Sequence, residues 1–158
     1  MEKKTKKAVT TQSLVETPFN HTYDVQLRFN DIDALGHLNN SVYFALFDLG
    51  KAKYFIDVRK EDIDWRKTDI VVANVNCNFL APTYFNENIA VQTQVTAMYD
   101  KSFMVVQQLI NKDTNEVKCV CSTIMVGFDV KKCVAAPIGA EWVELLSSYE
   151  GRNLKVEK

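Results

Sequence analysis

Apolar and polar residues alternate along five segments of the chain, and each alternation predicts a β-strand. The segments are 22–29, 70–80, 88–99, 102–110 and 116–128. Successive side chains of a strand point to opposite faces of a sheet, so we expect one face of each segment to be buried. Short turns at 100–101 and 111–115 join the last three segments, which predicts an antiparallel meander.

The segment 70–80 carries a row of asparagines opposite its apolar face. Its odd positions from Val71 to Phe79 are apolar, and Asn74, Asn76 and Asn78 occupy the other face. We expect these amides to form hydrogen bonds within the sheet or across a contact between subunits.

Residues 41–57 predict a long helix that is apolar on almost every side. One stripe is aliphatic: Val42, Ala45, Leu46, Leu49 and Ile56. Aromatic side chains occupy much of the remaining surface: Tyr43, Phe44, Phe47, Tyr54 and Phe55. Such a helix is buried rather than laid on a surface, and Asn40 or Ser41 is expected to cap its start. Gly50 in its interior costs about 1 kcal/mol relative to alanine, so we expect a strand or a ligand to approach the backbone there.

A shorter amphipathic helix is predicted near the C-terminus. Trp142, Leu145, Leu146 and Tyr149 lie at helical spacing, and the helix is expected to stop near Gly151. The order of strand, long helix, four strands and short helix predicts an α+β fold in which one curved sheet wraps one helix. A single sheet leaves free edges and an uncovered helix flank, so we expect at least a dimer formed by pairing of strand edges.

The length of 158 residues is that of one domain, which we place at residues 20–150. A flexible N-terminal tail, 1–19, and a C-terminal tail, 151–158, are expected to flank it. The N-terminal lysines are not followed by an apolar stretch, which argues against a secretory signal and favours a cytoplasmic location. No segment approaches the ~20 apolar residues of a membrane helix. A net charge of −1 argues against nucleic acid as a partner.

Four cysteines are present, and none belongs to a pair with metal-binding spacing. Cys119 and Cys121 are two apart and share a face if they lie on a strand; Cys77 and Cys133 are separate. We therefore expect small buried thiols in a reducing compartment, with no metal site.

The polar loop at 30–40 holds the densest group of reactive side chains. Asp31, Asp33, His37, Asn39 and Asn40 lie between a strand and the start of the apolar helix. Helix N-termini offer unpaired N–H donors that stabilise a developing oxyanion, and a neighbouring carboxylate can attack a carbonyl or activate water. Aspartates in such loops also commonly do no more than hydrogen-bond the local backbone.

The string RFNDIDALGHLNNSVYFALFD, residues 28–48, is more specific than a pair of aspartates. It resembles the signature of hotdog-fold acyl-CoA thioesterases, most closely the 4-hydroxybenzoyl-CoA thioesterase-like superfamily. The residues that carry the resemblance are Phe29, Asp31, Asp33, Gly36, His37, Asn39, Asn40 and Tyr43. FLAP at 79–82 and YDKSF at 99–103 are also similar to family segments, and the order of elements matches the hotdog fold. The resemblance covers roughly residues 20–149.

The resemblance implies that Asp33 is the catalytic carboxylate. It would attack the thioester carbonyl to give a mixed anhydride, or it would activate a water molecule. Main-chain N–H groups after Gly36 or at the helix start would polarise the thioester oxygen. Asn40 stands where some relatives place a histidine near the substrate. His37 stands where others have an aliphatic residue, so it is either an acid–base group or a histidine bonded to the loop.

Three further residues are candidates for substrate contacts. Tyr43 belongs to the motif itself. Asp48 lies where relatives often carry an acidic residue, although pairing with Lys51 or Arg28 is the simpler interpretation. Ser102 begins a strand and would contact the ligand or cap the turn. The asparagine row at 74–78 would line the pantetheine arm in the same interpretation.

The resemblance therefore implies an acyl-CoA or acyl carrier protein thioesterase that acts without a metal or redox cofactor, as a homodimer or homotetramer. A hotdog hydratase or dehydratase is one alternative, but such enzymes usually carry Asp-x-Asn-Pro-x-His, and here Asp33 and His37 are only four apart. A non-catalytic acyl-CoA-binding protein and a structural module are the others. Both would leave the carboxylate of Asp33 without a role.

Overall fold

The computed structural model describes residues 18–64 and 69–157, so residues 1–17 of the predicted N-terminal tail lie outside the described residues. Its elements in chain order are β1 (His21–Val25), a 3-10 turn η2 (Phe29–Asp31), α1 (Asn40–Arg59), β2 (Ile70–Phe79), β3 (Ile89–Met98), β4 (Ser102–Asn111), β5 (Val117–Asp129), β6 (Val134–Ala135) and α2 (Ala140–Glu150). The predicted α+β order is confirmed, with the short β6 as an addition.

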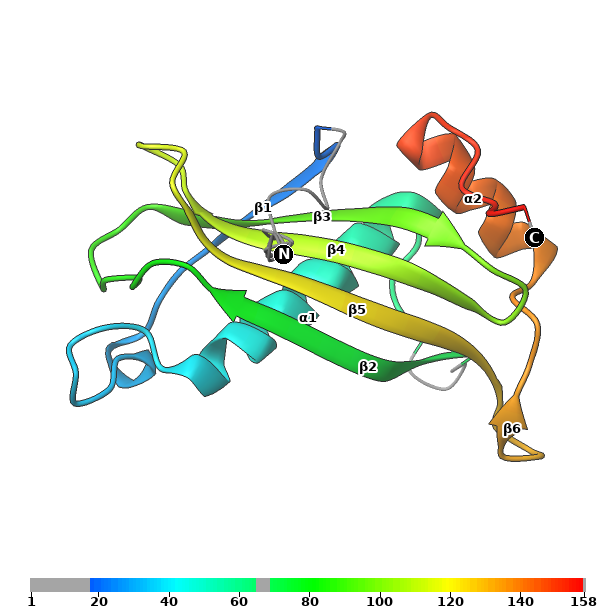
Figure 1. Ribbon diagram of the computed structural model, residues 1–158, viewed down its shortest axis with the longest axis horizontal. Helices are drawn as coiled ribbons and strands as arrows, with labels where there is room; N and C mark the ends of the chain where they lie inside the picture. The colour runs from blue at the N-terminus through cyan, green and yellow to red at the C-terminus, as the bar shows by residue number, and fades with distance from the viewer. Residues whose placement is uncertain (1–17, 65–68, 158) are drawn as a thin grey trace, which may run out of the picture.

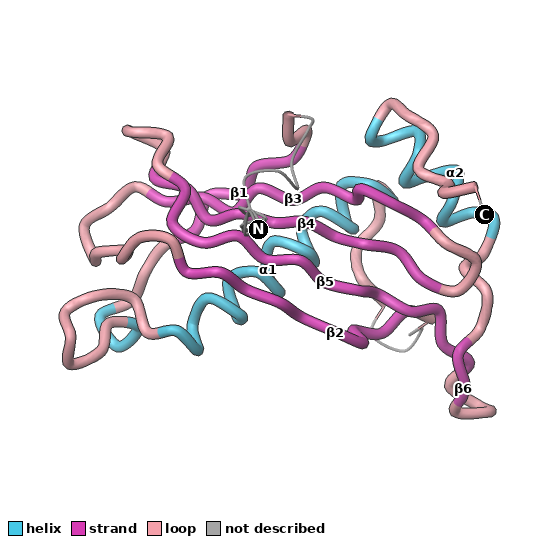
Figure 2. The backbone as a smooth tube through the Cα atoms, viewed as in Figure 1, coloured by secondary structure: helices cyan, strands magenta, loops and turns pink. Residues whose placement is uncertain are grey.

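One antiparallel sheet carries the strands in the order β1-β3-β4-β5-β2, and β6 pairs with the end of β5. The predicted meander is β3–β4–β5. The long helix α1 crosses one face of the sheet diagonally, and α2 lies near one end of it (Figure 1). Loops gather at the two ends of the sheet, and the loop before α1 and the β2–β3 connection lie at the same end (Figure 2). Both connections therefore lie close to the start of α1.

The core lies between α1 and the sheet and consists of two clusters. The first joins Leu46 and Phe47 of the helix to Val91, Leu109, Cys119 and Cys121 of the strands. The second joins Tyr54 and Val58 to Val95, Phe103, Met125 and Leu146. Each large apolar side chain buried in this way contributes about 1.5–3 kcal/mol, so packing against the sheet fixes the position of α1.

The start of α1 is capped by Asn39. Its Oδ1 accepts hydrogen bonds from Ser41 N at 2.9 Å and from Ser41 Oγ at 2.7 Å. The prediction that Asn40 or Ser41 caps the helix is therefore wrong by one position, because Asn39 still has the extended backbone that an N-cap residue requires.

The outer flank of α1 is not covered within one chain. Phe44 is 42% exposed and Leu49 is 40% exposed, whereas their neighbours Tyr43 and Gly50 are buried. The all-round burial predicted for this helix is thus absent in the single subunit, because the sheet reaches only one side of it. Exposed apolar side chains of this size are typical of a surface that contacts another protein.

The first strand is shorter than the segment 22–29 predicts. Its last paired residue is Val25, opposite Ile89 at the start of β3, so beyond this point the chain has no partner strand. The backbone then forms η2, with Arg28 N donating to Asp31 Oδ2 at 2.7 Å. Phe29, expected on the buried face, is 83% exposed.

A β-bulge changes which side of β2 faces the helix. The register shifts between Val72 and Asn74, so both Ile70 and Cys77 pack against the core although they are an odd number of residues apart. The single apolar face predicted for 71–79 is therefore wrong on the Val71 side of the bulge. The asparagine row remains on the outer face, where Asn78 Nδ2 donates to Asn76 Oδ1 at 3.3 Å.

Gly50 lies where the sheet approaches the helix backbone, as its position in the sequence predicts. A Cβ atom there would stand 2.5 Å from Val91 Cγ1 and 3.1 Å from Gln107 Nε2. Gly50→Ala should therefore lower the free energy of unfolding by about 1–2 kcal/mol, because overpacking outweighs the better helix propensity of alanine. Urea unfolding measures this. Adding Val91→Ala, which removes the clashing methyl group, should make the Gly50→Ala step cheaper; an equal cost in both backgrounds would contradict the explanation.

His21 makes the stability of the fold depend on pH. Its Nε2 lies 3.2 Å from Asp57 Oδ2, its ring packs edge-on against Tyr54, and its Nδ1 is buried without a partner among the described residues. Burial lowers the pKa of His21 below 6.5 and outweighs the attraction of Asp57. Because the unfolded chain then binds more protons, stability should be full above about pH 6.5 and fall as the pH drops toward the lower folded-state pKa.

Urea unfolding at pH 7.5 and pH 5.5 tests this expectation, with His21→Gln as the comparison. The variant should show a smaller loss of stability between the two pH values. A wild type that becomes more stable at pH 5.5 would mean that the ion pair with Asp57 prevails over burial.

The C-terminal residues return to the sheet after α2. Gly151 ends the helix with a φ of 68°, as its position predicts. Leu154 is buried, and Met98 N donates to its carbonyl oxygen at 2.7 Å. The predicted C-terminal tail, as far as residue 157, is thus docked against the end of β3.

Candidate active site

Residues 32–38 form a tight hairpin between η2 and α1. Ile32 and Leu38 pair across it, and Asp33 N donates to His37 O at 3.1 Å. Gly36 N donates to Asp33 O at 3.0 Å, and Gly36 has a φ of 81°, in the region that favours glycine. The hairpin therefore brings Asp33, Gly36, His37 and Asn40 together at the start of the long helix, as the sequence suggests.

The Asp33 carboxylate is half-buried, and only one of its oxygens is engaged. Oδ1 accepts a hydrogen bond from Leu35 N at 2.8 Å, which is the local loop bond typical of aspartate. Within residues 18–64 and 69–157, no donor reaches Oδ2. The loop thus fixes the side chain through one oxygen and leaves the other available for a reactant.

Most backbone N–H groups of this loop are already used. Those of Gly36, Leu38 and Asn39 donate to Asp33 O, Thr83 O and Asp31 O. Among the described residues, those of Ala34, His37 and Asn40 have no acceptor, and the last two lie nearer in sequence to the start of α1. Asn40 is also the first residue of α1, where the helix dipole adds partial positive charge. These two N–H groups are consequently the candidates for binding a carbonyl oxygen.

The side chains of His37 and Asn40 are accessible. His37 is half-buried and its ring has no hydrogen-bond partner in the part of the chain that the structure describes, while Asn40 is exposed. Neither side chain is tied to the loop, so both can reach a ligand at the hairpin. Their predicted roles remain predictions.

Tyr43 is a buried residue that links α1 to the β2–β3 connection. Its hydroxyl donates to Thr83 Oγ1 at 2.9 Å, and its ring packs edge-on against Phe79. Burial raises the pKa of Tyr43 above 10, so the phenol keeps the proton that it donates. In this subunit its contacts are structural, and a contact with substrate remains a prediction.

Asp48 lies on the exposed side of α1. Its Oδ1 is 2.8 Å from Lys51 Nζ. Asp48 therefore forms the ion pair with Lys51 that was the simpler alternative to a substrate contact. Lys51 itself is buried beside the core, and its ammonium group reaches outward to this carboxylate.

Ser102 stands at the opposite end of the sheet from the Asp33 hairpin. It opens β4 opposite Val126, next to the start of β2, and its carbonyl accepts from Tyr99 N at 2.8 Å. The start of β4 and the loop before α1 lie at opposite ends of the sheet (Figure 1), so within one chain Ser102 does not share a site with Asp33. A cavity of about 460 Å³ lies at this same far end. Its apolar lining includes Phe55, Ile70, Met125 and Trp142, and its charged lining consists of Arg59, Glu61, Asp62, Asp64 and Asp69.

A buried ion pair supports the β2–β3 connection, and sequence patterns give no sign of it. Lys118 Nζ lies 2.7 Å from Glu87 Oε1 and donates to Pro82 O at 3.1 Å. Burial opposes charge on both groups, but their mutual hydrogen bond and the further bonds to Glu116, Asn111 and Tyr84 N outweigh it. The pKa of Glu87 is lowered and that of Lys118 is raised, so both groups are charged at neutral pH.

The described residues contain no cluster of three or more histidine, cysteine, aspartate or glutamate side chains arranged to hold a metal ion. The cysteines lie mainly in the sheet: Cys119 and Cys121 are buried on the helix side, and Cys77 is half-buried opposite Cys121. Cys133 is exposed, against the prediction of buried thiols, because it lies in the turn before β6. No helix between residues 18 and 157, apart from 65–68, is long and apolar enough to span a bilayer.

Solved structures with this fold are numerous. A thioesterase from Thermus thermophilus, complexed with coenzyme A and zinc, is 24% identical, with a TM-score of 0.75 over 85% of this chain and 96% of the other. A 1,4-dihydroxy-2-naphthoyl-CoA thioesterase from Synechocystis is 13% identical, with a TM-score of 0.72 over 82% and 96%. A 4-hydroxybenzoyl-CoA thioesterase variant complexed with 4-hydroxybenzoyl-CoA is 19% identical, with a TM-score of 0.71 over 80% and 98%.

These similarities establish the predicted hotdog fold. No curated protein sequence matches the chain. The family model described as the thioesterase-like superfamily matches residues 27–146, which include the Asp33 hairpin, α1 and all of the sheet except β1. The chain belongs to the thioesterase-like superfamily.

Proposed function

We propose that this protein hydrolyses acyl-CoA thioesters to a free acid and CoA at the Asp33 hairpin. The observation that carries the proposal is the Asp33 carboxylate, held by Leu35 N through one oxygen and open at the other, near the free N–H groups of His37 in the same hairpin and of Asn40 at the start of α1. Acyl transfer requires a base or nucleophile next to hydrogen-bond donors that stabilise the developing oxyanion.

Asp33 acts on the thioester by one of two routes. As a nucleophile, Oδ2 bonds to the thioester carbonyl carbon, the C–S bond breaks, and the CoA thiolate takes a proton from water; water then cleaves the mixed anhydride. As a general base, Asp33 takes a proton from the water that attacks the same carbon; the C–S bond then breaks, and Asp33 returns the proton to the CoA thiolate. Both routes consume one water and end with the same acid and thiol.

The start of α1 supplies the electrophilic half of the site. The N–H groups of Asn40 and His37 would donate to the thioester oxygen as it becomes negative. Accessible side chains at the same two positions would contact the substrate near the reacting carbon. No part of this chemistry calls for a metal or redox cofactor, and CoA enters as part of the substrate.

A second copy of the chain would complete the site. Among the described residues β2 has a strand on one side only, and exposed apolar residues on β2 and α1 border its open edge. If two β2 strands pair antiparallel about a two-fold axis, the Ile70 end of one lies beside the Phe79 end of the other. The partner's Ser102 and the cavity beside the partner's Ile70 would then approach the Asp33 hairpin. The assembly would be a dimer, or a tetramer built from such dimers.

The proposal is tested by measuring free thiol and free acid from a panel of short-chain, long-chain and aromatic acyl-CoAs, with an acyl carrier protein thioester and an enoyl-CoA included. We expect hydrolysis of at least one thioester, and the preferred member defines the acyl group. Hydration of the enoyl-CoA without thiol release would identify a hydratase instead. Tight binding of acyl-CoA without turnover would identify a binding protein.

A further inference from the structure

We propose that Thr83 is a positioning residue for Asp33, held in place by the Lys118–Glu87 ion pair. The inference rests on the proposed function, because it assigns to Thr83 a role in the reaction of that site. Thr83 lies in the β2–β3 connection, fifty residues away from Asp33 in the sequence, and none of its side-chain surface is exposed.

Thr83 is hydrogen-bonded both to the Asp33 hairpin and to the first turn of α1. Its carbonyl oxygen accepts from Leu38 N at 2.8 Å, and its hydroxyl accepts from Tyr43 OH at 2.9 Å. Leu38 pairs with Ile32, the residue before Asp33, and Tyr43 lies in the first turn of α1. One residue therefore sets the distance between the carboxylate hairpin and the helix start that offers the N–H groups.

The connection around Thr83 is itself held firmly to the sheet. Leu80 N and Ala81 N both donate to Lys118 O, at 2.8 and 3.1 Å, and Lys118 Nζ donates to Pro82 O. On the other side of Thr83, Glu87 accepts from Tyr84 N at 2.7 Å and pairs with Lys118.

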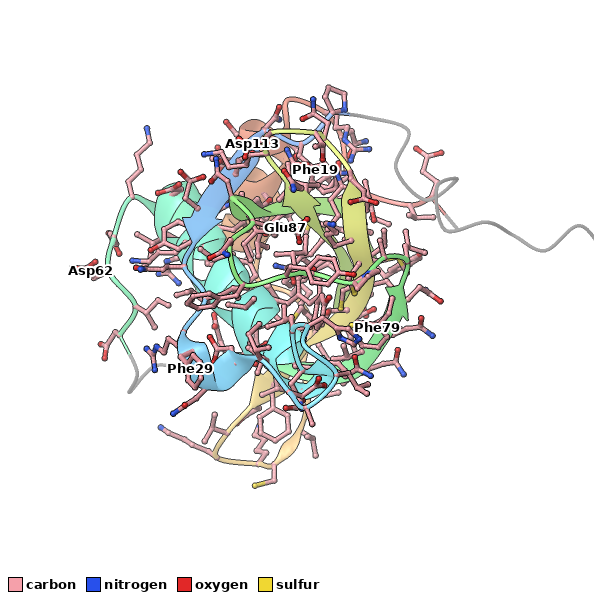
Figure 3. The ribbon with its side chains drawn as sticks, turned by 90° about the vertical axis from the view of Figure 1, so that its left-hand side faces the viewer. Phe19, Phe29, Asp62, Phe79, Glu87 and Asp113 are labelled. Atoms are coloured by element: carbon pink, nitrogen blue, oxygen red, sulfur yellow. The ribbon has the colours of Figure 1, made fainter. Side chains whose placement is uncertain are left out.

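Lys118 thus fixes the connection both before and after Thr83. Figure 3 looks onto this end of the molecule; Glu87 appears near the centre of the view, with Phe29 and Phe79 below it on either side. A buried lysine–glutamate pair is not needed to stabilise a fold, since apolar residues of similar volume commonly serve as well. The Lys118–Glu87 pair holds the chain on both sides of Thr83, which is hydrogen-bonded to the Asp33 hairpin. A positioning role explains this location of the pair.

Thr83→Val removes the hydroxyl and keeps the shape and the main chain, and Thr83→Ser keeps the hydroxyl. We expect Thr83→Val to lower kcat for the preferred acyl-CoA about tenfold with little change in KM, because a small misplacement of a reacting group slows the chemical step. Thr83→Ser should retain most of the wild-type kcat. A purely structural role would lower the melting temperature and leave kcat of the folded enzyme unchanged. Unchanged kcat in Thr83→Val, or a Thr83→Ser variant no better than Thr83→Val, would overturn the proposal.

Lys118→Met tests the ion pair, and Lys112→Met is the matched control. Lys112 Nζ lies 2.7 Å from Asp24 Oδ1, away from the Asp33 hairpin. Lys112 meets the β2–β3 connection through its main-chain N–H, which donates to Asn88 O at 2.8 Å and which Lys112→Met leaves in place. Lys118→Met should lower kcat and speed hydrogen exchange at the Leu38 amide, and Lys112→Met should do neither. Hydrogen exchange at Leu38 is measured without substrate, so it separates failure of the positioning role from failure of the proposed function. Unchanged exchange overturns the positioning role, whereas a wild type without thioesterase activity overturns the proposed function.

Discussion

Asp33→Asn is expected to lower the rate of thioester hydrolysis by about 10²- to 10⁴-fold, the range that a positioned base or nucleophile contributes. Asparagine has the same size, and its amide oxygen can still accept from Leu35 N, which is 2.8 Å from Oδ1 in the wild type. The hairpin should therefore keep its shape and lose only the charge and the reactive oxygen. Steady-state kinetics with the preferred acyl-CoA measures the effect, which should appear in kcat more than in KM.

Asp31→Asn is the matched control for this change. It lies two residues earlier, and its carboxylate accepts from Arg28 N at 2.7 Å, which an amide oxygen can also do. Its kcat should remain within a fewfold of the wild type. Equal losses in the two variants would point to disturbance of the loop, and full activity in Asp33→Asn would move the chemistry elsewhere, with Asp48 as the next carboxylate to test.

Val72→Lys combined with Val75→Lys is expected to convert the protein to a monomer and to abolish most of its activity. Both valines lie on the open edge strand β2 and are 47% and 38% exposed in the single chain. In an antiparallel pairing about a two-fold axis, four lysines would meet near the centre of the interface, and charged edge strands resist pairing. Activity should fall with the dimer, because each site is proposed to draw on both subunits.

Light scattering after size exclusion measures the mass, and thiol release measures the activity. Val130→Lys combined with Val156→Lys is the control, since these valines are at least as exposed, at 55% and 47%, and lie outside the edge strand β2, in the turn before β6 and near the C-terminus. The control should remain oligomeric and active. A wild type that is monomeric and active would contradict the shared site.

The sequence predicted the fold well wherever the pattern was long and regular. The meander β3–β4–β5 and the long helix have nearly the predicted bounds, because alternation and apolar periodicity over ten or more residues leave few alternatives. The end of β1 and the bulge in β2 were missed. Both depend on where the partner strand begins or shifts, and a single strand carries no information about its partner.

The candidate site divides in the same way. Asp33, Gly36, His37 and Asn40 are close in sequence, so a short hairpin was bound to bring them together. The capping role of Asn39 was missed by one position, since the polar residues around it offer several possible caps. Thr83 and Lys118 could not be found from periodicity, because the Thr83–Tyr43 hydrogen bond and the Lys118–Glu87 ion pair join residues that are far apart in the sequence.

The most direct test of the account is a crystal structure of Asp33→Asn with an intact acyl-CoA bound. We expect the variant to bind the substrate and to consume it too slowly to matter, so that the position of the thioester becomes visible. We predict that its carbonyl carbon lies within about 3.5 Å of the residue 33 side chain, with the oxygen facing the N–H groups of Asn40 and His37. A thioester bound away from the hairpin, with residue 33 beyond reach of the carbonyl, would contradict the assignment of this site.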